Sequence, residues 1–405
     1  MKKIITFFTL LLTLQLAYPC TTAIVSGKYT VDGRPLMLKN RDRSDSDNVL
    51  VTSKEGKYTY TAVVPLSDKA NRAVMYGQNE AGLVVMNSTS YNLEQKTDNP
   101  LKKGNIMRWA LERCATVDDF EAMIAELKYF DYGSNYGVMD AQGHAAYFEC
   151  GHLGYKKYDV DDPAVAPHGY LVRSNFGHSG DIKEGKGFAR YNKAVEILEQ
   201  AYQQKNISWR TLINMTRCLQ HGMTGVDLYD QMPDNEASEL IVNFIDYIPR
   251  YSTMSAYVAQ GVKPGEDPSL TIGWTCIALP LTTTVIPIWH TASNILPQCM
   301  QRNAEGQSTL VNWSNILKSY IWPWPYADGQ NYIQLSHLIN KQNTGLLQQT
   351  LEIEKDIVKR AEELMKKFRS KNKIDEQKLQ QYYQWTDSYI AKHYPRLIES
   401  HNLQP

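Results

Sequence analysis

The sequence predicts an α+β fold built from antiparallel sheets. Pairs of β-branched, apolar segments flank short turn signals in the first half of the chain, and amphipathic helical patterns follow without a regular strand–helix alternation. This order favours hairpins covered by helices over a doubly wound parallel sheet. The 405 residues, of which 43% are hydrophobic, are enough for one large domain or two ordinary ones.

The strand signals come in hairpins. Residues 21–27 are β-branched and small, Asp32 and Gly33 give a two-residue turn signal, and 35–40 is typical of the returning strand. Such a turn pairs positions symmetrically about itself, so Cys20 is expected beside residues in the low forties. Further strands are expected at 73–76, 83–87, 136–139, 144–149, 169–173, 254–259 and 271–279.

Helical patterns lie between and after these hairpins. Residues 106–114 form the first, and the run from Thr116 to Asp119 resembles a capping box that opens the second. Two more helices are expected at 188–202 and 208–219. These helices are expected to cover the sheets.

A run of Trp and Pro at 322–325 separates two parts of the chain. Proline has no backbone N–H, so regular structure is expected to break near 321–330. Beyond the break, apolar residues recur at helical spacing and predict a helical hairpin that packs on the body or on another subunit. The expected organisation is a leader at 1–19, a main domain at 20–325 and a C-terminal helical extension at 326–405.

The leader has the features of an export signal. Lys2 and Lys3 precede an apolar stretch from Ile4 to Ala17, which is too short to cross a bilayer. No later apolar segment is long enough to cross a membrane. The sequence therefore predicts an exported protein, periplasmic or extracellular, with no transmembrane segment.

Cys20 follows this leader directly. If the leader is removed up to Pro19, Cys20 carries a thiol and a free α-amine on one carbon. The amine has an ordinary pKa of about 7.7–8.0, so it can accept the thiol proton at neutral pH and serve as a built-in base. Two other roles compete with this one. A lipidated cysteine is one, although Ala17-Tyr18-Pro19 fits it poorly, and a disulfide cysteine is the other.

The composition argues against several classes of function. The formal net charge is +0 and no basic run interleaves with aromatic residues, so nucleic-acid binding is not expected. The six cysteines are scattered without a CxxC pair, and neither HExxH nor a phosphate-loop pattern occurs, so we expect no metal and no cofactor. His178, His221 and His290 lie in no motif that would place a histidine base beside Cys20.

A dense charged segment ends the first hairpin, at residues 39–43 (Lys-Asn-Arg-Asp-Arg). A carboxylate there could hold the protonated α-amine of Cys20, and a cation there could lower the pKa of its thiol. Ordinary ion pairs at a solvated strand end are the competing interpretation.

The Cys-Thr pair at 20–21, the hairpin and the run Leu-Lys-Asn-Arg-Asp that ends at Asp42 resemble the N-terminal nucleophile hydrolases of linear amides. That superfamily includes penicillin V acylase, bile salt hydrolase and the acyl-CoA:6-aminopenicillanate acyltransferases, in which the element usually reads Gly-Arg-Asn-x-Asp. The resemblance implies a four-layer αββα sandwich and an Asp42 that contacts the nucleophile. Lys39 stands where arginine is expected and Arg41 is close by, so either cation could tune the thiol.

Three further stretches follow in the family's order, and the resemblance extends over about residues 20–290. The Asn-Glu-Ala-Gly-Leu run before Asn87 implies that Asn87 lies in the oxyanion region. The Arg-Ser-Asn run implies that Asn175 donates its amide N–H to the developing oxyanion, and the following helix implies that Arg190 supports the nucleophile and Asp42. Without the resemblance, these three would be ordinary strand-end, loop and helix-surface residues.

The predicted function is an exported cysteine amidohydrolase that cleaves a linear amide through an acyl-enzyme on Cys20. The alternatives are an acyltransferase on the same fold, or a non-enzymatic surface lipoprotein with Cys20 lipidated. The expected partner is a small-molecule amide. The sequence leaves open the substrate, the disulfide pairing and the oligomeric state, with a homo-oligomer as one option. For leader removal, the resemblance implies autocatalytic loss of a short propeptide, here Tyr18-Pro19.

Overall fold

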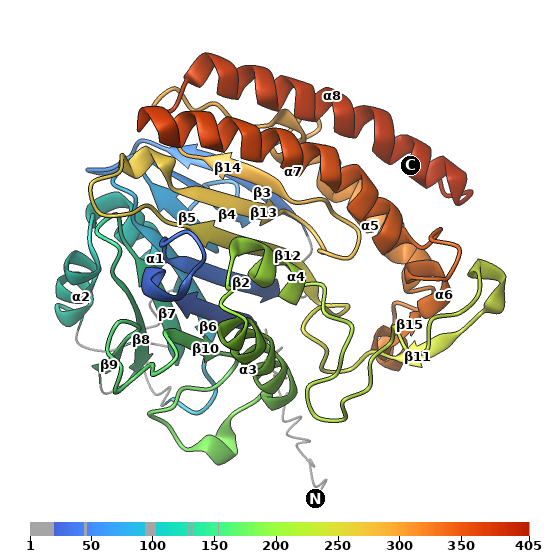
Figure 1. Ribbon diagram of the computed structural model, residues 1–405, viewed down its shortest axis with the longest axis horizontal. Coiled ribbons are helices and arrows are strands. Elements are labelled where there is room, and N and C mark those ends of the chain that lie inside the picture. The colour runs from blue at the N-terminus through green and yellow to red at the C-terminus, as the bar shows by residue number, and fades with distance from the viewer. Residues whose placement is uncertain are drawn as a thin grey trace, which may run out of the picture.

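The computed structural model describes residues 20–43, 47–93, 103–127, 130, 133–152 and 154–404. The expected leader lies outside these residues. Two antiparallel sheets face each other and helices cover their outer faces, which confirms the predicted α+β sandwich (Figure 1). No helix in these ranges is both long enough and apolar enough to span a bilayer.

The first sheet has six strands in the order β10-β1-β2-β12-β13-β14. Its strands are β1 (Thr21–Val25), β2 (Leu36–Asp42), β10 (Tyr170–Arg173), β12 (Thr253–Gln260), β13 (Ile272–Cys276) and β14 (Ile286–Trp289). All of its neighbouring strands are antiparallel. The start of β1 therefore lies beside the ends of β10 and β2 and near the start of β12.

The second sheet has seven strands in sequence order from β3 to β9. They are β3 (Asn48–Ser53), β4 (Tyr60–Pro65), β5 (Tyr76–Asn79), β6 (Val84–Thr89), β7 (Ser134–Met139), β8 (Ala145–Gly151) and β9 (Gly154–Asp159). A separate two-stranded ribbon joins β11 (Ile241–Asn243) to β15 (Tyr332–Gln334).

The helices form the outer layers. They are α1 (Lys103–Arg113), α2 (Val117–Ala125), α3 (Phe188–Gln203), α4 (Trp209–Met215), α5 (Thr309–Ile321), α6 (Leu335–Leu338), α7 (Leu346–Lys371) and α8 (Glu376–Ser400). Helices α1 and α2 pack on the seven-stranded sheet, whereas α3 and α4 pack on the six-stranded sheet. The layers therefore follow the order helix, sheet, sheet, helix, as the resemblance implied.

The two C-terminal helices protect an exposed strand edge. Helices α7 and α8 run side by side along one flank of the sandwich (Figure 1), where β14 is the last strand of its sheet. The Tyr383 hydroxyl on α8 accepts from the Trp289 N–H at 3.1 Å and donates to the Pro287 carbonyl at 3.1 Å. An uncovered edge would leave such backbone groups free to pair with another chain. The domain boundary expected near residue 325 stays a prediction.

The first hairpin differs from its expected form. Strand β1 ends at Val25 and β2 begins at Leu36, so the connection is longer than the two-residue loop expected at Asp32 and Gly33. A short 3-10 helix at Gly27–Tyr29 occupies the start of this connection. The register pairs Thr21 with Asn40, and extending it by one residue places Arg41 opposite Cys20. The position expected for Cys20, in the low forties, is therefore confirmed although the turn is different.

Several other boundaries also differ. The strand expected at 73–76 lies three residues further on, as β5, and the expected 271–279 strand divides into β13 and a turn that leads to β14. The elements that were not predicted are strands β3, β4, β9, β11, β14 and β15 and helices α5 and α6. The capping box is confirmed, because the Thr116 side chain accepts from the Asp119 N–H at 3.0 Å and Asp119 accepts from the Thr116 N–H at 3.1 Å.

A buried ion pair joins the body to α7. Arg217, just after α4, donates to both carboxylate oxygens of Glu354, and its Nε donates to the Pro280 carbonyl at 3.0 Å. The Val285 N–H also donates to Glu354, at 2.6 Å. A second ion pair lies at the surface, between Arg210 on α4 and Glu362 on α7 at 2.7 Å. It has the same charges but is exposed and has no hydrogen bonds to the body like those of Pro280 and Val285, so it serves as the surface comparison.

We expect Glu354→Gln to lower the free energy of unfolding by about 3–5 kcal/mol, because it leaves the Arg217 charge buried without its counter-ion. Glu362→Gln should change it by roughly 1 kcal/mol or less, since an exposed pair contributes little. Urea denaturation of both variants at pH 7 measures the difference. Equal losses in the two variants would contradict this role for Arg217 and Glu354.

Candidate active site

The candidate active site lies where four neighbouring strands meet at one edge of the six-stranded sheet. Cys20 immediately precedes β1, Asp42 ends β2, and the register pairs Thr22 with Arg173 and Asp42 with Thr253. Because the strands are antiparallel, these chain ends come together although they are far apart in sequence. The hairpin expectation had already brought Cys20 near Asp42, and the strand order adds the segments that follow β10 and precede β12.

The backbone nitrogen of Cys20 has a fixed acceptor. It donates to Asn175 Oδ1 at 3.0 Å, and the same oxygen accepts from Arg190 Nη2 at 2.7 Å. Asn175 Nδ2 donates to the Thr89 carbonyl at 2.9 Å, which fixes the orientation of the amide. The side chain that was expected to face the oxyanion thus also holds the nitrogen of Cys20. Its oxyanion role stays a prediction.

Arg190 anchors the start of β1 from helix α3. Its Nη1 donates to the Cys20 carbonyl at 2.6 Å and to the Thr21 hydroxyl at 2.9 Å. Burial lowers the pKa of the guanidinium to about 10, and the positive charge of Arg250 adds to this lowering, whereas the charges of Asp42 and Cys20 oppose it. Arg190 therefore remains a cation at neutral pH and lies within the same electrostatic environment as Asp42 and Cys20.

Helix α3 begins in a way that makes room for this guanidinium. Gly187 is its N-cap residue and has a φ of +84°, which side-chain-bearing residues rarely adopt. A Cβ atom at this position would overlap the guanidinium of Arg190. Glycine at 187 thus permits both the turn into α3 and the close approach of Arg190 to β1.

Asp42 is held by a different arginine from the one expected. Its Oδ2 accepts from Arg250 Nε at 2.7 Å, and its Oδ1 accepts from the Thr253 hydroxyl at 2.6 Å and from Asn40 Nδ2 at 3.2 Å. Arg250 lies within residues 20–290, over which the resemblance extends, but the resemblance gave it no role. The signal was weak because Arg250 lies far from Asp42 in sequence, and only the pairing of β2 with β12 brings the two together.

Lys39 and Asn87 form a contact between the two sheets. Lys39 Nζ donates to Asn87 Oδ1 at 2.9 Å and to the Met75 carbonyl at 2.7 Å, while Asn87 Nδ2 donates to Ser134 Oγ at 3.2 Å. Arg41 Nη1 donates to Asn48 Oδ1 at 2.5 Å. These contacts do not show whether Lys39 or Arg41 is the cation that tunes the thiol. That assignment stays a prediction.

Strand alternation indicates which way the Cys20 side chain faces. Thr21 meets Arg190 on the helix side of the sheet, whereas the Thr22 hydroxyl accepts from Tyr147 of the seven-stranded sheet at 2.8 Å. Successive side chains point to opposite faces, so Cys20 shares the face of Thr22 and Lys39, towards the other sheet. The thiol is therefore placed on the side of Asn87.

The loop that carries Asn175 is fixed by a buried carboxylate. Glu149, on β8, accepts from Arg173 Nε at 2.7 Å and from the N–H groups of His178 and Ser179 at 2.8 Å each. Burial alone would raise the pKa of Glu149, but the Arg173 charge and these hydrogen bonds hold it below its usual range. The ionised carboxylate thus tethers the loop on both sides of Asn175.

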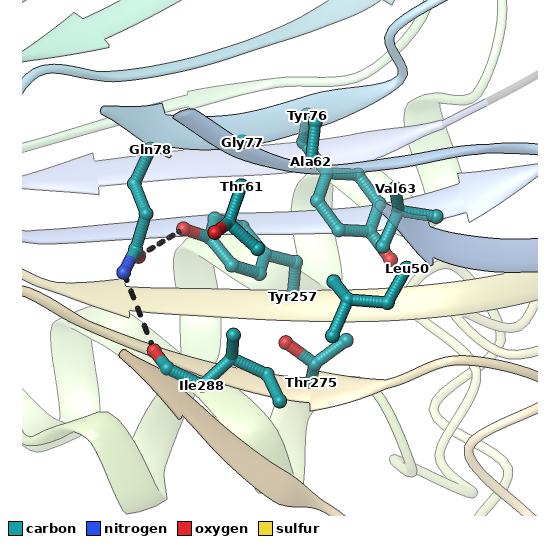
Figure 2. A pocket seen from close by; sticks show the side chains of 10 residues that line it. All are labelled: Leu50, Thr61, Ala62, Val63, Tyr76, Gly77, Gln78, Tyr257, Thr275 and Ile288. Carbon is teal, nitrogen blue, oxygen red and sulfur yellow. Dashed lines mark hydrogen bonds between the residues drawn. The ribbon is translucent and has the colours of Figure 1, made fainter. Parts of the chain in front are cut away.

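The interior between the sheets is closely packed away from Cys20. A cavity between the sheets has a volume of about 10 Å³, and the ring centres of Tyr76 and Tyr257, which line it, lie 4.6 Å apart in a stacked arrangement. Figure 2 shows the side chains around this cavity. Gln78 closes one side by accepting from the Tyr257 hydroxyl at 2.9 Å and donating to the Ile288 carbonyl at 3.3 Å (Figure 2). A space of this size holds about one water molecule, so it is a packing void and not a substrate site.

Residues 30–220 match the family of acyl-coenzyme A:6-aminopenicillanic acid acyl-transferase. This stretch contains Asp42, Asn87, Asn175 and Arg190, and it begins after Cys20. No curated protein sequence matches the chain.

Solved structures with similar folds are enzymes from three organisms. The N-acylethanolamine-hydrolyzing acid amidase ortholog of Caenorhabditis elegans is 13% identical, with a TM-score of 0.39, and covers 62% of this chain and 93% of its own. Penicillin V acylase from Agrobacterium tumefaciens is 13% identical, with a TM-score of 0.42, and covers 67% and 87%. The conjugated bile acid hydrolase of Clostridium perfringens, in a mutant form, is 11% identical, with a TM-score of 0.39, and covers 67% and 92%.

The match over residues 30–220 confirms the resemblance found in the sequence to the acyl-coenzyme A:6-aminopenicillanic acid acyl-transferases, and the layers of the structure have the αββα order that this resemblance implied.

Proposed function

We propose that the chain, once residues 1–19 are removed, is an exported cysteine amidohydrolase that cleaves a linear amide through an acyl-enzyme on Cys20. One observation carries the proposal: the Cys20 nitrogen donates to Asn175 Oδ1 at 3.0 Å, on a side chain that Arg190 also holds. Removal of the leader would convert this nitrogen into an α-amine that already has a fixed partner. The chemistry needs such an amine as its base.

The reaction needs no further base. The α-amine takes the thiol proton, and the thiolate attacks the amide carbonyl to form a tetrahedral oxyanion. When the C–N bond breaks, the departing nitrogen takes the proton back from the α-ammonium and leaves an acyl-thioester on Cys20. Water, activated by the same amine, then attacks the thioester and releases the acid and the thiol.

Asn87 is suited to bind the oxyanion. Its oxygen accepts from Lys39 at 2.9 Å, and a cation bound to the oxygen of an amide makes the N–H groups of that amide better donors. Asn175 would supply a second donor, as the resemblance implies. A donor of this kind contributes roughly 3–4 kcal/mol to the stability of the transition state.

A histidine is a poor alternative base in this structure. His290 lies between the hydroxyls of Thr59 and Thr61, at 2.8 and 2.9 Å, and His221 contacts Thr224 within its own loop. Burial lowers the pKa of His290 to about 4, and burial together with the Arg173 charge does the same for His178. Such imidazoles are too weakly basic to deprotonate a thiol efficiently at neutral pH.

Acyl transfer is the second candidate function, and the family match favours it. It shares the acyl-enzyme and differs only in the final acceptor, which is an amine in place of water. Incubation with hydroxylamine during turnover separates the two outcomes, because a transferase partitions towards the hydroxamate more strongly than a hydrolase. A panel of N-acyl amino acids, penicillin V, conjugated bile salts and short peptides identifies the acyl group.

The lipoprotein alternative is disfavoured by burial. Cys20 is 6% exposed, so a diacylglyceryl group on its thiol would require the side chains packed around Cys20 to move. The mass of the mature N-terminal peptide decides between a free Cys20 and a lipidated one.

We expect Cys20→Ala to abolish amide cleavage and to leave the fold intact, because the thiol supplies the only bond to the acyl group. Cys20→Ser should retain at most a small fraction of the activity, since a hydroxyl is a weaker nucleophile, and it should also stall leader removal. Activity is followed by release of the amine, and folding by the thermal unfolding midpoint. Normal turnover by the alanine variant would exclude Cys20 as the nucleophile.

Activity should require a free Cys20 amine. A protein with one additional residue before Cys20, in a form that cannot be processed, should lose activity because its base is converted into an amide. Replacing His178, His221 or His290 singly should leave most of the activity. The opposite pattern, with an active extended protein and one inactive histidine variant, would identify a Cys–His hydrolase instead.

Asp42 and Arg190 should act as one unit. Asp42→Asn and Arg190→Gln are each expected to reduce kcat/KM strongly, and the double variant to be little worse than the worse single variant. The physical reason is that both charges stabilise one arrangement of the Cys20 thiol and amine. A double-variant cycle on kcat/KM measures the coupling, and strictly additive losses would show that the two residues serve separate steps.

A further inference from the structure

Helix α5 carries a buried lysine at the edge of the candidate active site. This helix lies outside the stretch that matches the acyltransferase family. Its packed face includes Leu317 and Ile321, and Lys318 lies on the same face with only 7% of its surface exposed. Lysine is rarely buried to this extent, because its charge must then be compensated by nearby polar groups.

The Lys318 ammonium binds a backbone turn. Its Nζ donates to the Tyr251 carbonyl at 2.6 Å and lies 4.0 Å from the centre of the Tyr251 ring. Both contacts are favourable for a cation, the second through the negative face of the ring. Tyr251 directly follows Arg250, so Lys318 binds the same turn as the arginine that holds Asp42.

That turn is closed around the Asp42 carboxylate. The Arg250 N–H donates to Thr253 Oγ1 at 3.0 Å, and the Thr253 N–H donates to the Arg250 carbonyl at 2.8 Å. Thr253 and Arg250 then each donate a side-chain hydrogen bond to Asp42. Residues 250–253 therefore connect Lys318 on one side to Asp42 on the other.

The charges that act on Lys318 come from two segments: Asp42 lies at the end of β2, and Asp47 lies just before β3. The turn that Lys318 binds also carries Arg250, whose guanidinium is paired with Asp42. Asp47 is held on α5 itself, because its Oδ1 accepts from Asn315 at 2.8 Å. Burial lowers the pKa of Lys318 to about 7, while the negative charges of Asp42 and Asp47 limit the decrease.

We propose that Lys318 is a positioning residue of the Cys20 site, which acts through the 250–253 turn and the Asp42 charge to set the pH range in which the thiol reacts. The inference rests on the proposed function, and it assigns to the C-terminal region a part in the chemistry. The Lys318 ammonium contacts Tyr251 and not Cys20, so its effect on the thiol is indirect. Its influence reaches Cys20 through Asp42 and Arg190.

The sign of the effect follows from charge alone. An ammonium near Asp42 makes the site more positive, which favours the thiolate of Cys20 and disfavours protonation of its α-amine. Lys318 is charged below pH 7 and loses its charge as the pH rises through about 7. It therefore extends the reactivity of Cys20 towards lower pH and contributes little above neutral pH.

A comparison of four proteins separates the effect of the Lys318 charge from the effect of its hydrogen bond. They are the native chain, Lys318→Arg, Lys318→Gln and Lys318→Met. Arginine keeps the charge at every pH, glutamine keeps only a donor for the Tyr251 carbonyl, and methionine keeps neither. Leu317→Ala is the packing control, since Leu317 is fully buried on the same helix and carries no charge. The thermal unfolding midpoint of each variant reports how far its fold is disturbed.

Two readouts are measured between pH 5 and 9 on protein whose N-terminus is shown to be Cys20. One is kcat/KM for the best substrate of the panel. The other is the rate of alkylation of Cys20 by iodoacetamide, located by peptide mass, which needs no substrate. Burial raises the pKa of the thiol in each of the other cysteines, so these should react slowly.

We expect the acid limb of both profiles to lie at the lowest pH in Lys318→Arg, higher in the native chain, and highest in Lys318→Gln and Lys318→Met. The last two should coincide and should be shifted from the arginine variant by at least about half a pH unit. Leu317→Ala should reduce stability and leave the position of the limb unchanged.

The proposal is overturned if the acid limbs of all four proteins coincide. It is also overturned if the glutamine variant behaves like the native chain, because the effect then belongs to the hydrogen bond and not to the charge. Failure of the proposed function gives a different result: no amide in the panel is cleaved by the native chain, while the alkylation profiles still order the variants. The two failures are therefore distinguishable.

Discussion

The buried guanidinium of Arg190 is the group on which the candidate site depends. It reaches from helix α3 to the start of β1 and to Asn175, so it joins three segments that are separate in sequence. A buried cation is costly unless hydrogen bonds and counter-charges surround it. The Cys20 carbonyl, the Thr21 hydroxyl and the Asn175 oxygen supply the hydrogen bonds, and Asp42 supplies the charge. The geometry at Cys20 is thus a condition for burying Arg190 at all.

The balance of charge at this edge is uneven. Two arginines, Arg190 and Arg250, share one buried carboxylate, Asp42, because the second carboxylate beside them, Asp246 at 3.5 Å from Arg250, is half exposed to solvent. A site with an excess of buried positive charge favours anions, which under the proposed function are a thiolate and, in the transition state, an oxyanion. It also disfavours a further ammonium, which under the same proposal would keep the α-amine of Cys20 available as a base. One arrangement of charges serves both requirements.

The sequence could predict what depends on neighbouring residues. The capping box at Thr116 and the approach of Cys20 to the low forties were both predicted from local patterns, and Asp42 was found through its motif. The length of the first connection was not predictable, because the Asp-Gly signal of residues 32–33 does not reveal the 3-10 helix before it. Strand β9 was missed because charged residues and aromatics interrupt its pattern, whereas residues 49–51 of β3 and 62–64 of β4 are uninterrupted apolar runs that carry an ordinary strand signal.

The contributions of Arg250 and Lys318 were beyond sequence reasoning for a different reason. Each is an ordinary cation in its own segment, and its role arises only when β12 pairs with β2 and α5 packs on the turn at 250–253. The sequence around a lysine does not show whether its ammonium will be buried beside a carboxylate or will cover a helix surface. The spacing of α5 places Lys318 on the same face as the buried Ser314, but this spacing does not reveal the carboxylate.

The C-terminal region has two physical roles that follow from where it packs. Helices α7 and α8 cover the edge strand β14, where Tyr383 satisfies backbone groups that would otherwise be exposed. Helix α5 instead packs at the start of β12, on the 250–253 turn that binds Asp42. A chain without α5 would keep the motif residues but would expose that turn to water, where the Arg250–Asp42 pair is weaker because solvent screens it. Under the proposal, α5 therefore supports the strength of the charges at the site, whereas α7 and α8 of the extension support the stability of the sheet.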